Sequence, residues 1–267
     1  MNNVTVTDLN LRSAIEKALG KATNDPANVN EIAELKDLEA RESGLRDLRG
    51  IESAKELTRL SAGGNSVSVL SPLQELRNLK YLDLWGNAIT DLSPLHGLTN
   101  MRGLWLQGNR INDIAALTEL INLETLNLEN NNISDLAPLK RLTSLKWLSL
   151  AGNSISDISP LSDMRRLEGL WIHGNLISDI SVLEELTNLN DIGLHNNRIS
   201  DLSVLEGLTR LIRLEVDINS ISEFTHLSGL RSLNTLKVEI EGPLPLSFLA
   251  DDQRRGGVLK VYISKFE

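Results

Sequence analysis

The sequence repeats itself every 22 residues, and this period leaves few folds open to the chain. Around each repeat the pattern LxxLxLxxNxI recurs, so leucines stand at its first, fourth and sixth positions. One such repeat cannot bury its leucines alone, whereas stacked repeats share a continuous core. The period therefore predicts a solenoid in which each repeat adds one short strand to a parallel sheet. The asparagines that mark the period are Asn65, Asn87, Asn109, Asn131, Asn153, Asn175, Asn197 and Asn219.

Each repeat also predicts its own turns. We expect the asparagine amide to bond backbone groups that would otherwise be unpaired in the bend after the strand. Four residues further on stands a column of acids, for example Asp91 and Asp113. We expect these carboxylates to accept backbone N–H groups at the start of a convex turn, and calcium binding is the less favoured interpretation. Prolines such as Pro94 suit the first residue of a short helical turn.

An open solenoid end would expose leucines, so both ends need caps. Residues 8–19 have a helical apolar face that Gly20 ends, and Asn28 and Glu31 have the spacing of a capping box. We therefore predict a helical N-terminal cap over residues 1–34 and about ten strand turns over residues 35–240. A small C-terminal cap over residues 241–267 is expected to hold a short helix, a Gly-Gly turn and a strand.

Composition excludes several kinds of function. The 267 residues carry a formal net charge of −9, which argues against a nucleic-acid partner. The chain has no cysteine, so disulfides and thiol chemistry are excluded. No apolar run reaches the ~18 residues of a membrane span, and the first residues lack the pattern of a signal peptide. Neither a Gly-rich phosphate loop nor a G-x-S-x-G elbow occurs, so we expect no enzyme and no cofactor.

The repeat resembles a known family. The unit LxxLxLxxNxIxDLSPLxxLTN, which residues 78–100 match nearly throughout, is similar to the leucine-rich repeats of the bacterial internalin-like group. The resemblance implies an α/β fold, a right-handed leucine-rich-repeat solenoid shaped as a horseshoe or arc. Its parallel β-sheet would be concave, with short helical or 3-10 turns on the convex side. It also implies a secreted or cell-surface binding module that uses the concave face, although a cytoplasmic location stays open.

The concave face holds the most informative residues. All four tryptophans of the chain occupy positions whose side chains alternate with the leucines and so point outward. An indole can bury ~150–250 Å², and tryptophan is enriched at binding hot spots. We therefore predict a binding patch, against the alternative that each ring covers a gap beside glycines such as Gly103, Gly169 and Gly193. The predicted partner-binding residues are Tyr81, Asp83, Trp85, Trp105, Gln107, Asn127, Glu129, Trp147, Trp171, His173, Asp191 and His195.

Three kinds of ligand fit this face. A protein partner, bound by a monomer of this chain, is the preferred hypothesis. A glycan could stack on the indoles, and a quaternary ammonium could sit between indoles and a carboxylate. The third is a metal ion, since His173, His195 and Asp217 follow one another on successive strands with zinc-competent side chains. We favour ordinary polar side chains over a metal site at these positions.

Overall fold

The computed structural model describes residues 6–22, 25–217, 221, 225–239 and 260–264. These residues fall into two compact units, unit 1 (residues 1–133) and unit 2 (residues 134–267). No helix within these ranges is long and apolar enough to cross a membrane.

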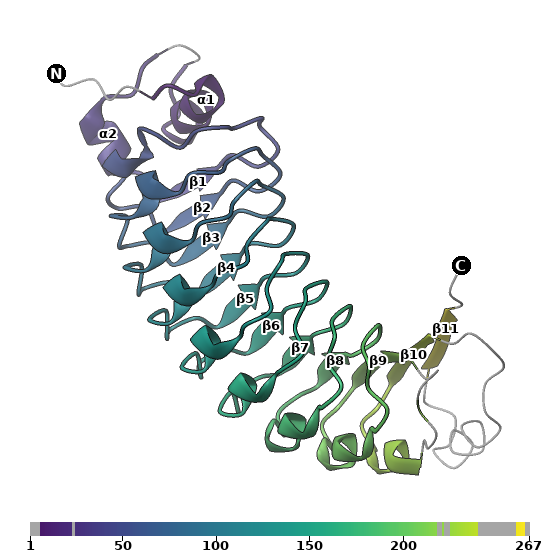
Figure 1. The fold of residues 1–267 in the computed structure, drawn as a ribbon. Coiled ribbons are helices and arrows are strands. Elements are labelled where there is room, and N and C mark those ends of the chain that lie inside the picture. Colours follow the sequence, from purple (N-terminus) through teal and green to yellow (C-terminus); the bar gives the residue numbers. More distant parts are fainter. Residues whose placement is uncertain (1–5, 23–24, 218–220, 222–224, 240–259, 265–267) are drawn as a thin grey trace. The chain divides into compact units, whose positions relative to one another are not determined.

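Unit 1 is a run of stacked repeats behind two helices (Figure 1). The helices are α1 (Leu9–Ala18) and α2 (Val29–Ala33). Five parallel strands pair in chain order, each with the strand of the next repeat. They are β1 (Asp37–Glu39), β2 (Arg59–Ser61), β3 (Tyr81–Asp83), β4 (Gly103–Trp105) and β5 (Thr125–Asn127). The 3-10 helices between them are Ile51–Ser53, Ser71–Leu73, Ser93–Leu95 and Ala115–Leu117.

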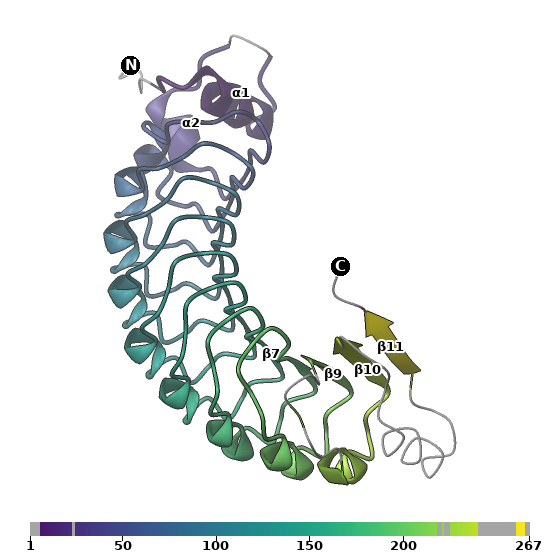
Figure 2. The ribbon, with the colours of Figure 1, turned by 45° about the vertical axis from the view of Figure 1, so that its right-hand side comes forward.

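Unit 2 has the same plan, with six parallel strands in chain order. They are β6 (Trp147–Ser149), β7 (Gly169–Trp171), β8 (Asp191–Gly193), β9 (Arg213–Asp217), β10 (Thr235–Glu239) and β11 (Lys260–Ser264). Its 3-10 helices are Ala137–Leu139, Ser159–Leu161, Ser181–Glu185, Ser203–Gly207 and Thr225–Gly229. In both units these short helices line the side away from the strands (Figure 2). The predicted right-handed leucine-rich-repeat solenoid with a parallel sheet is thus confirmed.

The core is the predicted ladder of leucines. In β4 and the residue after it, Leu104 and Leu106 are fully buried, while Trp105 between them is half-buried. The same alternation holds for Leu170 and Ile172 around Trp171 in unit 2. Side chains at alternate strand positions face opposite sides of a sheet, so one side of each strand is committed to the core. The other side, which we name the strand face, is left for polar and aromatic residues.

The asparagine ladder has the predicted structural role. The Asn131 amide donates to the carbonyl oxygens of Leu106 and Leu128, both at 3.0 Å, and its Oδ1 accepts the Ile111 N–H at 3.0 Å. Asn175 repeats the same pattern in unit 2 with Leu150, Ile172 and Ile155. Each asparagine therefore ties its own bend to the preceding repeat. Asn219, the last asparagine of the series, lies outside the described residues.

The acid column likewise starts the turns on the helical side. Asp91 accepts the Ser93 N–H at 2.8 Å, and Asp179 accepts the Ser181 N–H at the same distance. These backbone bonds hold the pKa of both carboxyls below the ordinary value. Pro94 lies in the first turn of its 3-10 helix, as predicted. The acids of this column therefore serve as hydrogen-bond acceptors for backbone N–H groups.

The described ends agree with the predicted elements. Asp8 caps α1, and Asn28 with Glu31 forms the predicted capping box on α2. At the other end β11 pairs in parallel with β10. The predicted C-terminal helix and Gly-Gly turn lie outside the described residues, and the predicted division at residues 34 and 240 stays a prediction.

Candidate functional site

The strand face of each unit carries a share of the predicted binding residues. Those of unit 1 lie on β3, β4 and β5 or within two residues after them: Tyr81, Asp83, Trp85, Trp105, Gln107, Asn127 and Glu129. Those of unit 2 lie on β6, β7 and β8 or within two residues after them: Trp147, Trp171, His173, Asp191 and His195. Eleven of these twelve are half-buried, and Trp147 is the exposed one.

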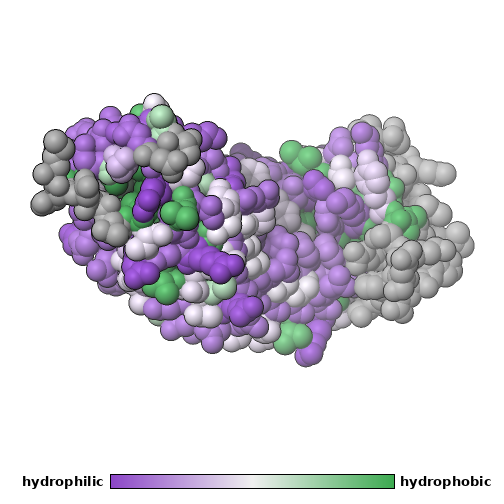
Figure 3. Space-filling model, turned by 90° about the horizontal axis from the view of Figure 1, so that it is seen from above, coloured by the Kyte–Doolittle hydropathy of each residue, from purple (hydrophilic) through white to green (hydrophobic). Residues whose placement is uncertain are grey.

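The large exposed apolar side chains of unit 1 come from separate parts of the chain. They are Leu9 in α1, and Val69 and Ile121 in connecting segments of two different repeats. In the view of Figure 3 the coloured surface is mostly hydrophilic, and hydrophobic residues occur as isolated spots.

In unit 1, both tryptophans lie over glycines. A Cβ added to Gly63 would overlap the Trp85 ring, and one added to Gly103 would lie 2.5 Å from Cη2 of Trp105. Tyr81 also reaches Gly103, at 3.0 Å from such a Cβ. The glycines thus leave the space over the strands that the rings occupy. The alternative reading of the sequence, in which each ring covers a glycine gap, describes this packing, and it leaves the outer side of each half-buried ring for contact.

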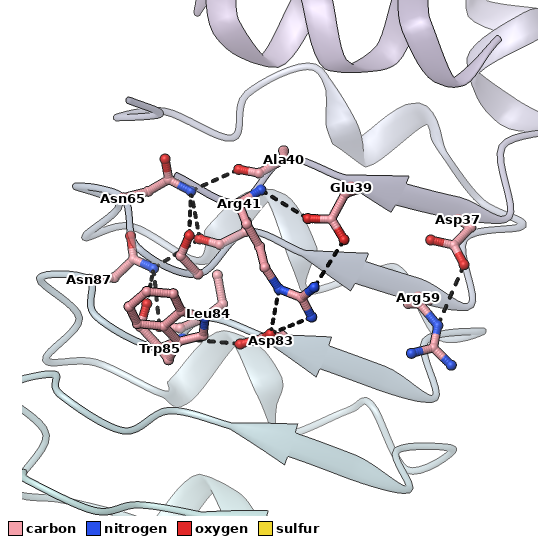
Figure 4. Close-up of polar contacts among 12 residues, drawn as sticks. Asp37, Glu39, Ala40, Arg41, Arg59, Asn65, Asp83, Leu84, Trp85 and Asn87 are labelled. Carbon is pink, nitrogen blue, oxygen red and sulfur yellow. Dashed lines mark hydrogen bonds and ion pairs between the residues drawn. The ribbon is translucent and has the colours of Figure 1, made fainter. Parts of the chain in front are cut away.

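A charged network formed by Arg41, Glu39 and Asp83 lies on the strand face of unit 1, beside Trp85 (Figure 4). Arg41 donates through Nε and Nη2 to Oδ2 of Asp83, at 2.9 and 2.8 Å, and through Nη1 to Glu39 at 3.2 Å. The Asp83 side chain is only 13% exposed, so its carboxylate has lost most of its water. The two hydrogen bonds from Arg41 neutralise the charge of this carboxylate. Arg59 lies over the Tyr81 ring, with Cζ 4.6 Å from the ring centroid.

Unit 1 also has a small cavity on its strand face. It holds about 250 Å³ and is lined by Arg41, Arg59, Tyr81, Asp83 and Trp105, together with parts of β2. Arginine was not among the predicted site residues. The bond from Arg41 to Asp83 spans 42 residues and two strands, and the repeat pattern gives no sign of it.

Two of the three remaining predicted residues of unit 1, Asn127 and Glu129, bond with neighbouring residues of the chain. Oδ1 of Asn127 accepts the Glu129 N–H at 3.0 Å, and Oε1 of Glu129 accepts a bond from the Asn130 amide. Oε1 of Gln107 is buried and accepts no hydrogen bond within the described part of the chain. A buried amide oxygen of this kind needs a donor.

In unit 2 the two tryptophans stack on each other. The ring centroids of Trp147 and Trp171 are 5.7 Å apart, and the ring planes differ by 15°. Both rings lie over Gly169, where an added Cβ would overlap Trp147 and lie 2.6 Å from Cη2 of Trp171. Trp147 is 37% exposed. We name this pair the indole stack.

The two histidines of unit 2 also stack. The ring centroids of His173 and His195 are 4.2 Å apart with 15° between the planes. Burial lowers the pKa of His195, an effect that Lys237 adds to and that Glu215 and Asp217 oppose. Nδ1 of His195 lies 3.9 Å from Glu215. No group of three histidine, aspartate or glutamate side chains in the described ranges is placed to hold a metal ion.

Acidic residues of unit 2 differ in how they are paired. Oε1 of Glu215 accepts bonds from Nη2 of Arg213 at 2.9 Å and from Lys237 at 2.7 Å. Oδ1 of Asp191 is buried and has no hydrogen-bond partner among the described residues. Burial raises the pKa of Asp191, with Glu215 acting in the same direction and Arg213 and Lys237 against it.

A larger cavity in unit 2 lies apart from these residues. It holds about 540 Å³ and is lined by Lys146, Arg166 and Arg210 among others, and it contains none of the predicted site residues.

Comparison with known proteins places this geometry in a family. A family model described as "Leucine Rich repeats (2 copies)" matches residues 55–96, 99–141 and 143–186. The solved structure of internalin C2 from Listeria monocytogenes is 32% identical, with a TM-score of 0.78, over 81% of this chain and 98% of that chain. An internalin, InlF, from the same species is 28% identical, with a TM-score of 0.57, over 96% of this chain and 90% of that chain.

A leucine-rich repeat protein from Leptospira interrogans, LIC12759, shares the fold at 24% identity and a TM-score of 0.66, over 79% of this chain and 62% of that chain. A search of curated protein sequences found no match. The repeat pattern, the parallel strands and the match to internalin C2 over nearly its whole length lead to one conclusion: the chain belongs to the bacterial internalin-like leucine-rich repeat family.

Proposed function

We propose that this chain is a non-enzymatic module that binds a protein partner through the aromatic residues of its strand faces. Leucine-rich repeat proteins of the internalin type generally mediate protein–protein binding. The observation that carries the proposal is the indole stack, in which Trp147 keeps 37% of its surface exposed while resting on Trp171 and Gly169. A ring outside the leucine core, supported from beneath and open above, has the character of a binding hot spot.

The family also supports a proposal on where the protein acts. We propose that it acts as a monomer, secreted or at the bacterial cell surface, and that it needs no cofactor.

The test begins with selection of partners by the full chain, immobilised and presented with a displayed library of protein fragments. Binding of each selected partner is then measured for the wild type and for Trp105→Ala, Trp147→Ala and Trp171→Ala. We expect each substitution to weaken binding by about 2 kcal/mol or more. We expect each to lower the free energy of unfolding by less than about 1 kcal/mol, because the rings lie outside the leucine core.

A matched control lies on the helical side of unit 1. His96 is exposed there, and His96→Ala should leave both binding and stability unchanged. If every selected partner bound all three tryptophan variants as tightly as the wild type, the strand faces would not be the binding site. If the variants unfolded, the rings would be packing elements instead.

One observation supports a second candidate, a glycan receptor. The cavity of about 250 Å³ in unit 1 combines two aromatic rings, Tyr81 and Trp105, with hydrogen-bonding groups on Arg41 and Asp83. Pockets that combine apolar walls with a few polar groups suit small ligands. Binding of labelled oligosaccharides that is lost in Tyr81→Ala, with no protein selected by the wild type, would favour this candidate.

A further inference from the structure

The indole stack of unit 2 offers aromatic faces at a fixed place. Gly169 supports both rings, and no other side chain could take its place there without displacing them, since even a Cβ would overlap Trp147. Because the neighbouring ring fixes its orientation, Trp147 does not have to be ordered when a ligand arrives. The face of an indole carries partial negative charge and attracts cations.

A carboxylate stands beside the stack. Asp191 on β8 pairs in register with Gly169 on β7, so it follows the glycine on which both rings rest. Its Oδ1 is buried and accepts no hydrogen bond within the described part of the chain. A buried acceptor without a donor costs free energy, and a charged one costs more.

The cations nearest to Asp191 are already engaged. Arg213 is bonded to Glu215 through Nε at 3.0 Å and Nη2 at 2.9 Å, and Lys237 is bonded to the same oxygen at 2.7 Å. Arg213 and Lys237 therefore both bond to Glu215, and they act on Asp191 only through longer-range electrostatic attraction. With Asp191, Glu215 and Asp217 set against Arg213 and Lys237, this part of the strand face has one acid in excess.

We propose that Trp147, Trp171 and Asp191 form a receptor for a single organic cation, the ammonium or guanidinium end of a basic side chain on the protein partner. This inference rests on the proposed function and names the chemistry that unit 2 recognises. A cation on the indole faces gains their attraction, and one beside the half-buried Asp191 carboxylate also gains the attraction of an opposite charge. An anion would meet the excess acid, and within the described residues no group of three histidine, aspartate or glutamate side chains is placed to hold an inorganic cation.

The test uses small probes, so it needs no partner and can fail while the proposed function holds. The full chain is titrated with N-acetyl-lysine methylamide, N-acetyl-arginine methylamide and tetramethylammonium, and with uncharged N-acetyl-glutamine methylamide as the control ligand. The readouts are the indole N–H resonances of Trp147 and Trp171 and the carboxyl resonance of Asp191. We expect the cations to shift all three resonances together and the glutamine derivative to leave them in place.

Two variants and a matched control complete the test. Asp191→Asn and Trp147→Ala should each weaken binding of the lysine and arginine probes at least tenfold, while the circular dichroism spectrum stays that of the wild type. Asp37→Asn should bind as the wild type does, since Asp37 has the equivalent strand position in β1, opposite Arg59 rather than an indole-covered glycine.

Several results would overturn the inference. Equal shifts with the charged and uncharged probes would do so, as would unchanged cation binding in Asp191→Asn. A response to tetramethylammonium alone would assign the site to a free quaternary ammonium rather than to a partner's side chain. A response to disaccharides alone would assign it to a glycan.

Discussion

Asp83 in unit 1 and Asp191 in unit 2 are two carboxylates on equivalent strand faces, and they differ in whether a nearby arginine bonds to them. Asp83 receives two bonds from Arg41, so its charge is neutralised within the unit. Asp191 also has an arginine near it, but Glu215 holds that arginine through two bonds. The carboxylate of Asp83 is thus paired within unit 1, whereas that of Asp191 is not hydrogen-bonded by the cations near it in unit 2. The repeat therefore fixes where side chains point and leaves open which charges are satisfied, and the unsatisfied charge is where a partner can contribute most.

The largest expected effect tests what the two units share. Asn131→Ala in unit 1 and Asn175→Ala in unit 2 should each lower the free energy of unfolding by about 1–3 kcal/mol, because buried backbone groups lose their partners. Urea denaturation of the two variants measures this. A midpoint equal to that of the wild type in either variant would mean that the asparagine ladder of that unit does not stabilise it. A large difference between the midpoints of the two variants would show that the ladder contributes unequally to the two units.

The next prediction tests the contrast itself. Asp83→Asn should destabilise the chain by about 1 kcal/mol, a modest figure because the Arg41 side chain is 46% exposed. Asp191→Asn should leave stability at neutral pH unchanged or raise it by up to about 1 kcal/mol, since a neutral amide replaces a partly buried charge that lacks a partner. Equal losses in the two variants, measured by denaturation, would break the comparison.

Glycine substitutions sharpen the comparison of the aromatic residues. Gly169→Ala would displace two rings and Gly103→Ala would chiefly displace Trp105, so we expect losses of about 1 kcal/mol and about 0.5 kcal/mol. Tryptophan emission should shift to longer wavelength in both. Gly207→Ala and Gly97→Ala are the matched controls, because a Cβ there meets nothing within 4 Å. Unchanged emission in Gly169→Ala would show that the rings do not rest on this glycine.

The smallest effect concerns pH. In the unfolded chain His195 has its ordinary pKa of about 6.5, whereas burial lowers it in the folded chain. As pH falls below about 6.5 the unfolded chain takes up a proton that the folded chain resists, so stability falls until the folded pKa is passed. His195→Gln should reduce this dependence. Identical pH profiles for the wild type and His195→Gln would contradict the prediction.

The sequence is enough to predict the scaffold because the scaffold is periodic. Leucine spacing predicts which side of each strand is buried, and the structure confirms it for residues such as Leu104 and Leu106. The roles of the asparagines and of the acids on the helical side follow from their spacing in the same way. The packing of Trp105 on Gly103 could also be anticipated, since the pair lies two residues apart on one strand.

The pairing of charges could not be predicted in this way. Arg41 reaches Asp83 across 42 residues, and Lys237 reaches Glu215 across a strand boundary, through long side chains that can adopt many rotamers. Which acid each cation selects depends on distances of a few ångström on a surface without periodic constraint. The stacking of His173 on His195 has the same origin, because their shared position in the repeat does not fix the angle of either ring.

The reach of the asparagine bonds has a consequence for how such a chain can change over generations. Each amide contacts a carbonyl three residues back, another 25 residues back and an N–H 20 residues back, so its bonds extend no further than the preceding repeat. When a gene gains or loses 22 codons, each asparagine amide still meets equivalent backbone donors and acceptors in the preceding repeat. When the change is 21 codons, the asparagine after the change no longer faces those backbone groups. Within the repeats, tandem duplication and deletion in whole periods are therefore the changes in length that selection can accept.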